Sequence, residues 1–166
     1  MLTTQDLTAT FARSLTNIQT ALKEVSESEC VYQPPFNSNC INWVLGHILN
    51  NRNSILRFLG ATPILTEEQR QRYAYGSPPV CAAGPDVIPL GEMLRLLEES
   101  QLRIAAALEV ITPAGLLKET EHARRKMTVE QALLFTLGHD CLHAGELNIL
   151  KELVASCRPA AAAPAK

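Results

Sequence analysis

The amino-acid sequence predicts an all-α protein, a small bundle of helices folded as one domain. Four long segments repeat their apolar residues at spacings of three and four, which is the period of a helix that buries one side. No segment shows the sustained alternation of apolar and polar residues that indicates a strand. The length of 166 residues suits one domain with a sizeable core. We therefore expect a single bundle across residues 1–157.

The first two predicted helices span about 7–25 and about 38–59. Thr3, with Asp6 three residues on, has the side chain of an N-cap for the first of them. The second must begin after Pro34-Pro35, and Gly60 stands where the end of a helix favours glycine. The apolar stripe of the first helix is Leu7, Phe11, Leu15, Ile18, Leu22 and Val25. That of the second is Ile41, Val44, Leu45, Ile48, Ile55 and Leu59.

The third predicted helix begins near Pro89, a favourable residue for a first turn, and closes before Thr112-Pro113. Its apolar stripe is Leu90, Met93, Leu94, Leu97, Ile104 and Leu108. The fourth opens at Thr128, with Gln131 at the spacing of a capping box, and continues to about Ala155. Each of the four is long enough to run the length of a small bundle.

The connections carry weaker signals. Residues 61–88, rich in Pro and Gly, separate the second and third helices, and a short helix is expected to start at Thr66. A connection of this length usually has a function or joins elements that lie far apart. Because it could extend along the whole bundle, it leaves the relative direction of the two helices open. A further short helix is expected after Pro113. Residues 158–166, nearly all Ala and Pro, are predicted to be a disordered tail.

Composition excludes several classes of function. The formal charge of −2, with no basic cluster beyond Arg124-Arg125-Lys126, argues against a nucleic-acid-binding surface. The five cysteines are scattered and form no C-x-x-C pair, as expected of reduced thiols in a cytosolic protein. The first 25 residues contain no apolar signal-peptide region, and no stretch reaches membrane-spanning length. We expect a soluble, cytoplasmic protein with no nucleic-acid or membrane partner.

Two histidines in the fourth helix have the spacing of a metal-chelating pair. His139 and His143 are four residues apart, which lets both imidazoles reach one ion. The apolar residues on the same side are Ala132, Phe135, Leu142, Leu150 and Leu153. This pattern predicts that the histidines point into the core, where each ring nitrogen needs a partner. Glu146 shares their side as a ligand, an acceptor for an imidazole N–H or a base, and the sequence leaves these three roles open.

His47 extends this pair to three imidazoles. Two histidines four apart are often no more than hydrogen-bonded core or surface residues, but His47 lies midway along the second helix, at the edge of its apolar stripe. Asn50, Asn51 and Ser54 form the polar strip beside it and are kept outside the predicted site. Three imidazoles with open coordination positions suit zinc, nickel, iron or manganese. We predict that His47, His139 and His143 bind one divalent ion between the two helices, with one side open.

Other candidate residues are interpreted as structural. His122, in the charged segment 118–126, is expected on the solvated surface. The segment His139-Asp-Cys-Leu-His143 has Asp where the zinc-protease motif H-E-x-x-H has Glu, and the chain lacks the strands of such proteases. Glu119-Thr-Glu-His122 is a single E-x-x-H, whereas a di-iron bundle needs two. Trp43 is expected in the core, and Cys141 in the core or an interface.

Two stretches together resemble the DinB/YfiT-like superfamily. These are Asn42-Trp-Val-Leu-Gly-His47, continuing to Gly60, and Gly138-His139-Asp-Cys-Leu-His143-Ala-Gly-Glu146. The resemblance implies a four-helix bundle with a long connection between helices two and three, and a divalent metal on His47, His139 and His143 with solvent at open positions. It also implies a homodimer. Glu146 departs from the Gln of many relatives, and Leu142 replaces an aromatic residue.

The resemblance also implies a metal-dependent enzyme acting on a small molecule. Relatives include thiol transferases and a thiol-dependent maleylpyruvate isomerase, and others are described as metal-dependent hydrolases. We therefore expect thiol S-transferase or hydrolase chemistry, with a low-molecular-weight thiol as a candidate substrate and residues 61–88 as a lid. The catalytic residues are not assigned. The alternative is a non-catalytic, metal-stabilised helical module for binding or dimerisation, because Leu134, Leu137 and Cys141 form a second apolar face that must be covered.

Overall fold

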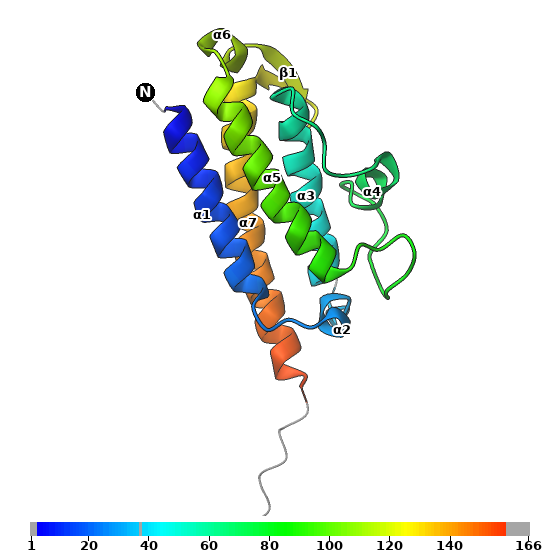
Figure 1. The fold of residues 1–166 in the computed structure, drawn as a ribbon. Helices are drawn as coiled ribbons and strands as arrows, with labels where there is room; N and C mark the ends of the chain where they lie inside the picture. Colours follow the sequence, from blue (N-terminus) through cyan, green and yellow to red (C-terminus); the bar gives the residue numbers. More distant parts are fainter. Residues whose placement is uncertain (1–2, 37, 159–166) are drawn as a thin grey trace, which may run out of the picture.

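The computed structural model of the chain describes residues 3–36 and 38–158, and four long helices in it form a bundle (Figure 1). The elements in chain order are α1 (Thr4–Leu22), α2 (Glu27–Cys30), α3 (Ile41–Phe58), α4 (Glu67–Arg72), α5 (Leu90–Val110), α6 (Pro113–Leu116), β1 (Glu119–His122), β2 (Arg125–Thr128) and α7 (Val129–Ser156). The expectation of an all-α bundle is confirmed. None of the described helices is both long enough and apolar enough to span a bilayer.

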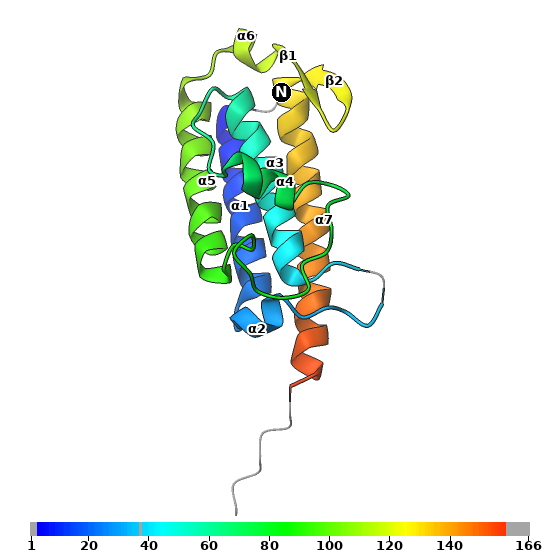
Figure 2. The same cartoon turned by 90° about the vertical axis from the view of Figure 1, so that its right-hand side faces the viewer.

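The long connection decides the direction of the helices, which the sequence left open. In Figure 2, α3 and α5 run in one direction along the bundle, while α1 and α7 run in the other. α7 packs against α1 and α3, and α5 packs against the same two helices on their other side. The chain can leave the end of α3 and start α5 at the opposite end because the residues between them return along the bundle, with α4 lying beside α3 (Figure 2).

The predicted helix ends agree with the structure at Thr3, Thr66, Thr128 and Gly60, and the short helix expected after Pro113 is present. Thr3, Thr66 and Thr128 each form a complete capping box, and Thr112 caps the short helix α6. Gly60, at φ +73°, follows α3 in a Schellman arrangement, since its N–H and that of the next residue donate to carbonyls of the last turn. Two ends differ from the prediction, because α1 stops at Leu22 and α3 begins at Ile41.

The expectation that no strand is present was wrong. β1 and β2 form a short antiparallel hairpin in which Glu119 pairs with Thr128 and His122 with Arg125. Its two-residue turn, Ala123-Arg124, has positive φ at both positions, the backbone of a primed hairpin turn. The sequence concealed the hairpin because its four-residue strands are mostly charged and its turn lacks the usual Asn or Gly.

A buried polar layer crosses the middle of the bundle and takes one residue from each long helix. Arg52 of α3 and Asp140 of α7 are both fully buried, and Arg52 Nε donates to Asp140 Oδ2 at 2.9 Å. Ser14 of α1 donates to the same carboxylate oxygen at 3.1 Å, and Ser100 of α5 accepts from Arg52 Nη1 at 3.3 Å. The apolar core is divided into two clusters, one towards each end of the bundle.

The polar layer also corrects the predicted core side of α7. Asp140 faces the centre of the bundle, whereas Leu142 is 70% exposed and Phe135 is 38% exposed. The histidines therefore lie beside the core and not at its centre. The helical period alone could not show this, because α7 carries apolar residues on several sides and one of its fully buried positions is a carboxylate.

The end of the chain is described only to Arg158. Its guanidinium donates to the carboxylate of Glu29, so this first residue of the predicted tail is held against the segment after α1. The rest of the predicted tail, 159–166, lies outside the described residues.

Replacing Asp140 by alanine should destabilise the fold strongly, because the guanidinium of Arg52 would remain buried without its anion. We expect the free energy of unfolding to fall by about 3–5 kcal/mol, measured by urea denaturation with metal removed by a chelator. The matched control is Glu92→Ala, which breaks the exposed pair with Arg95 and should cost about 0–1 kcal/mol. Equal losses in the two variants would contradict the role of the buried layer.

Candidate metal centre

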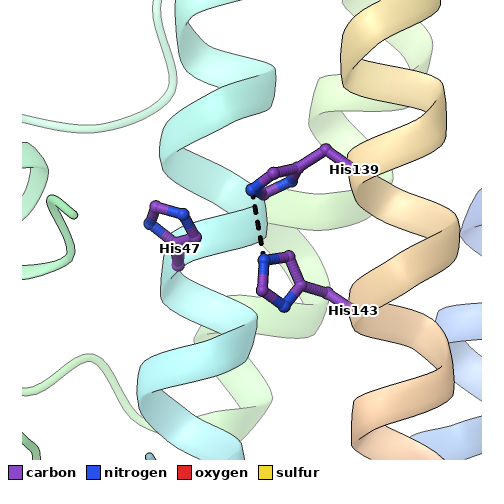
Figure 3. Close-up of side chains that lie close together, drawn as sticks. All are labelled: His47, His139 and His143. Carbon is purple, nitrogen blue, oxygen red and sulfur yellow. Dashed lines mark hydrogen bonds between the residues drawn. The ribbon is translucent and has the colours of Figure 1, made fainter. Parts of the chain in front are cut away.

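The structure brings the three predicted histidines together between α3 and α7. One ligand-type atom from each of His47, His139 and His143 lies within 4.8 Å of the other two. Figure 3 shows His139 and His143 one above the other on successive turns of α7, facing His47 on α3. The ring centroids of His139 and His143 are 4.3 Å apart, and those of His47 and His139 are 5.0 Å apart. A three-histidine group of this size can hold a divalent ion.

Two of the three rings are oriented by a hydrogen bond on the nitrogen away from the group. His47 Nδ1 donates to the carbonyl oxygen of Tyr73 at 2.9 Å, and His143 Nδ1 donates to Glu146 Oε2 at 2.7 Å. Since both partners can only accept, a neutral ring keeps its lone pair on Nε2, which is the nitrogen left for an ion. Of the three roles left open for Glu146, the geometry favours the acceptor that orients an imidazole.

The third ring shows why the group suits a cation. His139 Nε2 lies 3.1 Å from His143 Nε2 and 3.3 Å from the amide nitrogen of Asn51. Burial, with the neighbouring imidazoles, lowers the pKa of His139 to about 3, and burial also lowers the pKa of His47. Both rings are therefore neutral near pH 7, the state in which imidazole binds metals. If both Nε2 atoms carried only lone pairs they would repel at this distance, so the contact is favourable when one nitrogen carries a proton or when both bind a metal ion.

The nitrogen of His139 on the far side of its ring has a different environment. His139 Nδ1 is buried and has no hydrogen-bond partner within residues 3–36 and 38–158. The other two histidines thus have a fixed outer partner, while His139 is held by packing between Phe135 and the neighbouring imidazoles.

A close approach to α3 places the acceptor for His47. The ring of Tyr73 packs directly on Gly46, where an added Cβ would lie 2.1 Å from the ring carbon Cδ1. The hydroxyl of Tyr73 donates to Asn42 Oδ1 at 3.0 Å and accepts from the Ile88 N–H at 2.9 Å. These contacts fix the connection between α3 and α5 against α3, so the Tyr73 carbonyl is held beside the imidazole.

Trp43 has both the role predicted for it and a second one. It is only 6% exposed, as expected of a core residue, and its Nε1 donates to Ser77 at 3.0 Å. Its ring also stacks on His47, with centroids 4.9 Å apart and planes 18° from parallel. The side chain therefore covers one face of the imidazole and excludes water from that side.

A cleft of about 420 Å³ opens beside the histidines. His47 and His139 line it, together with Asn51 and Ser54, which the sequence analysis kept outside the site. Residues of the predicted lid also line it, in the stretch from α4 to Tyr75. The cleft is large enough for a small molecule and reaches the histidine group from the solvent side.

The expectation for His122 was wrong. It is 7% exposed and lines the same cleft, with its ring edge-on to Phe58 at 5.6 Å and to Phe135 at 5.3 Å between centroids. Burial lowers the pKa of this imidazole. The charged neighbours in the sequence suggested that His122 is exposed to solvent. In a β-strand, however, successive side chains point to opposite sides, and the strand β1 directs His122 towards α7.

Replacing Gly46 by alanine should disturb the site through Tyr73. The added Cβ overlaps the tyrosine ring, so the connection must move and the carbonyl that accepts from His47 is displaced. We expect a lower melting temperature and roughly 10- to 100-fold weaker binding of cobalt or zinc, measured by competition with a chromophoric chelator.

The control for this variant is Gly145→Ala in the interior of α7, where an added Cβ meets nothing within 4 Å. That change should leave metal affinity unaltered and raise stability by about 0.5–1 kcal/mol, because alanine is the better helix former. Similar metal affinity in both variants would show that the packing of Tyr73 does not support His47.

Comparisons with known proteins match the sequence to one family and the fold to a solved structure. The family model described as the DinB superfamily matches residues 10–147, a range that contains all three histidines. A solved structure, described as a conserved protein of Enterococcus faecalis, is 15% identical, with a TM-score of 0.70 over 94% of this chain and 99% of that one. At this identity the likeness shows the fold alone. No curated protein matches the chain.

Proposed function

Because this chain belongs to the DinB superfamily and has a three-histidine group that can hold a metal ion, we propose that it is a metal-dependent enzyme acting on a small molecule. The proposed chemistry is thiol S-transfer or hydrolysis, with a low-molecular-weight thiol as the candidate substrate. The observation that carries the proposal is the open cleft beside two of the three histidines, since a purely structural site is normally closed by a fourth protein ligand.

The residues of the site divide the work between them. The Nε2 atoms of His47, His139 and His143 would hold the ion, and Glu146 and the Tyr73 carbonyl keep two of these rings in position. A divalent ion such as zinc, nickel, iron or manganese, when bound, supplies Lewis acidity and lowers the pKa of a thiol or of water. The cleft admits the substrate on the open side of the group.

Metal content tests the first part of this proposal. Protein purified without a metal-binding tag should contain about one divalent ion per chain by elemental analysis, and His47→Ala and His143→Ala should each lose most of it. His122→Ala is the matched control, because it removes a cleft imidazole that lies outside the three-histidine group. Full metal content in both ligand variants would remove the central assignment.

Catalysis is tested on the unchanged protein and on the His47→Ala, His143→Ala and His122→Ala variants. Cysteine-derived thiols with a range of electrophiles, and a panel of ester and amide substrates, should reveal a rate that disappears on chelation and returns when the ion is added back. Normal metal content with no metal-dependent rate on any of these would favour the non-catalytic alternative.

The alternative module has one observation in its favour. Leu142, Ile149 and Leu134 are 70%, 68% and 46% exposed on the outer side of α7. The second apolar face differs from its predicted form, since Leu137 is buried in the bundle and Cys141 is exposed. An exposed apolar row on one helix suits contact with a second copy of the chain, and we propose a homodimer through this surface.

Replacing Ile149 by glutamate should separate such a dimer, because it introduces a charge into the exposed apolar row of α7. Sedimentation velocity should show a dimer for the unchanged protein and a monomer for this variant. Leu102→Glu on α5, at a residue that is 71% exposed, is the matched control and should remain dimeric. A monomer in the unchanged protein would end the dimer proposal without affecting the metal site.

A further inference from the structure

The cleft beside the histidines is more positively charged than the chain as a whole. Two arginines, Arg70 and Arg124, are among the residues that line it, and no lining residue in the described part of the chain is acidic. The complete chain, by contrast, has 17 acidic and 15 basic residues and a formal charge of −2. A metal ion on three neutral imidazoles would add to this positive charge.

Arg124 lines the cleft from the turn of the β1–β2 hairpin. It occupies the second position of the hairpin turn at φ 62°, after Ala123 at φ 51°, and neither is the glycine or asparagine that such turns favour. The guanidinium of Arg124 is exposed and makes no hydrogen bond or ion pair with the residues that the structure describes. The turn thus brings Arg124, a cation without a partner among the described residues, to the lining of the cleft.

Arg70 approaches from α4 and is held close to α3. Its carbonyl oxygen accepts from the amide of Asn50, one helical turn beyond His47, at 3.1 Å. One nitrogen of its guanidinium pairs with Glu67, whose side chain is 60% exposed, while Nε is buried and has no hydrogen-bond partner within the described residues. Nη2 makes no hydrogen bond or ion pair with the described residues, and the side chain is 27% exposed, so this nitrogen can still donate to a ligand. The backbone of Arg70 cannot move away without breaking the contact with Asn50.

The rest of the lining is neutral and partly apolar. Phe135, Tyr75 and Ala74 form an apolar part of the wall. The amide of Asn51 lies within hydrogen-bond reach of His139 Nε2, at the open side of the histidine group. A ligand that fills this space would meet the histidines at one point, apolar side chains along its length and guanidinium groups elsewhere. This is the pattern of a small molecule with a metal-binding group and a separate anionic group.

We propose that the cleft binds an anionic small molecule, with its metal-binding group at the three histidines and its anionic group at Arg70 and Arg124. The inference rests on the proposed metal-dependent function and adds the charge class of the substrate. Guanidinium groups pair with carboxylate and phosphate oxygens in fixed geometry, so they select for anions more strongly than a general positive potential does.

The test uses cobalt-loaded protein and thiols that differ only at the far end. The probes are 3-mercaptopropionate and 6-mercaptohexanoate, each compared with the mercapto-alcohol of the same length, and binding is followed by the thiolate-to-cobalt absorption band. We expect the acids to bind about tenfold more tightly than the alcohols for at least one length. Arg124→Gln and Arg70→Gln should each reduce this preference several-fold and leave the affinity for the alcohols unchanged.

Arg125→Gln is the matched control, since it removes the same charge from the next residue of the hairpin, which does not line the cleft. It should retain the full preference for acids. Equal affinities for acids and alcohols, no binding of any probe to protein that holds cobalt, or the same loss in Arg125→Gln as in Arg124→Gln would each overturn the inference. Failure to hold cobalt at all would instead reject the proposed function on which it rests.

Discussion

The ion pair between Arg52 and Asp140 is the contact on which the arrangement of the bundle depends. Burial raises the pKa of the Asp140 carboxyl, and the hydrogen bonds from Arg52 and Ser14 oppose that shift. A buried charge is tolerated only where its partners are in place, so this layer admits few alternative packings of the four helices. It therefore specifies how α7 is rotated and shifted against α3, which apolar contacts alone would leave less defined.

That rotation carries the histidines with it. Because Asp140 points to the centre of the bundle, the adjacent His139, and His143 one turn later, lie beside the core in the groove facing α3. His47 lies five residues before Arg52 on the same helix α3, so the same ion pair aligns the third imidazole. The site is thus built on rigid helices on both sides, and a contact from outside these helices comes from the carbonyl of Tyr73, held by close packing on Gly46.

The two segments outside the long helices give the site its cleft. The connection containing α4 brings Arg70 and Tyr73 against α3, and the hairpin brings His122 and Arg124 to the start of α7. Neither segment contributes a ligand to the three-histidine group. Variation in these segments would change what enters the cleft while the histidine group stayed intact, which is the usual relation between a scaffold and its loops.

The sequence by itself determined the elements and the ligand-type residues. Helical periodicity and capping residues such as Thr3, Thr128 and Gly60 act over a few positions, so the helices and their ends could be read from local pattern. The spacing of His139 and His143 fixed their common side in the same way, and His47 was added from its place midway along another helix, at the edge of its apolar stripe.

Only the tertiary structure decided the direction of α5, the inward face of α7 and the burial of His122. Each depends on contacts between residues far apart in the chain, which leave no periodic signal. The local sequence gives no sign that Asp140 is buried, because its partner Arg52 lies 88 positions earlier in the chain. His122 is read as solvated until the Ala123-Arg124 turn folds the hairpin back towards Phe135. Local sequence encodes propensity and spacing, whereas burial and charge pairing are set by the partner that the fold supplies.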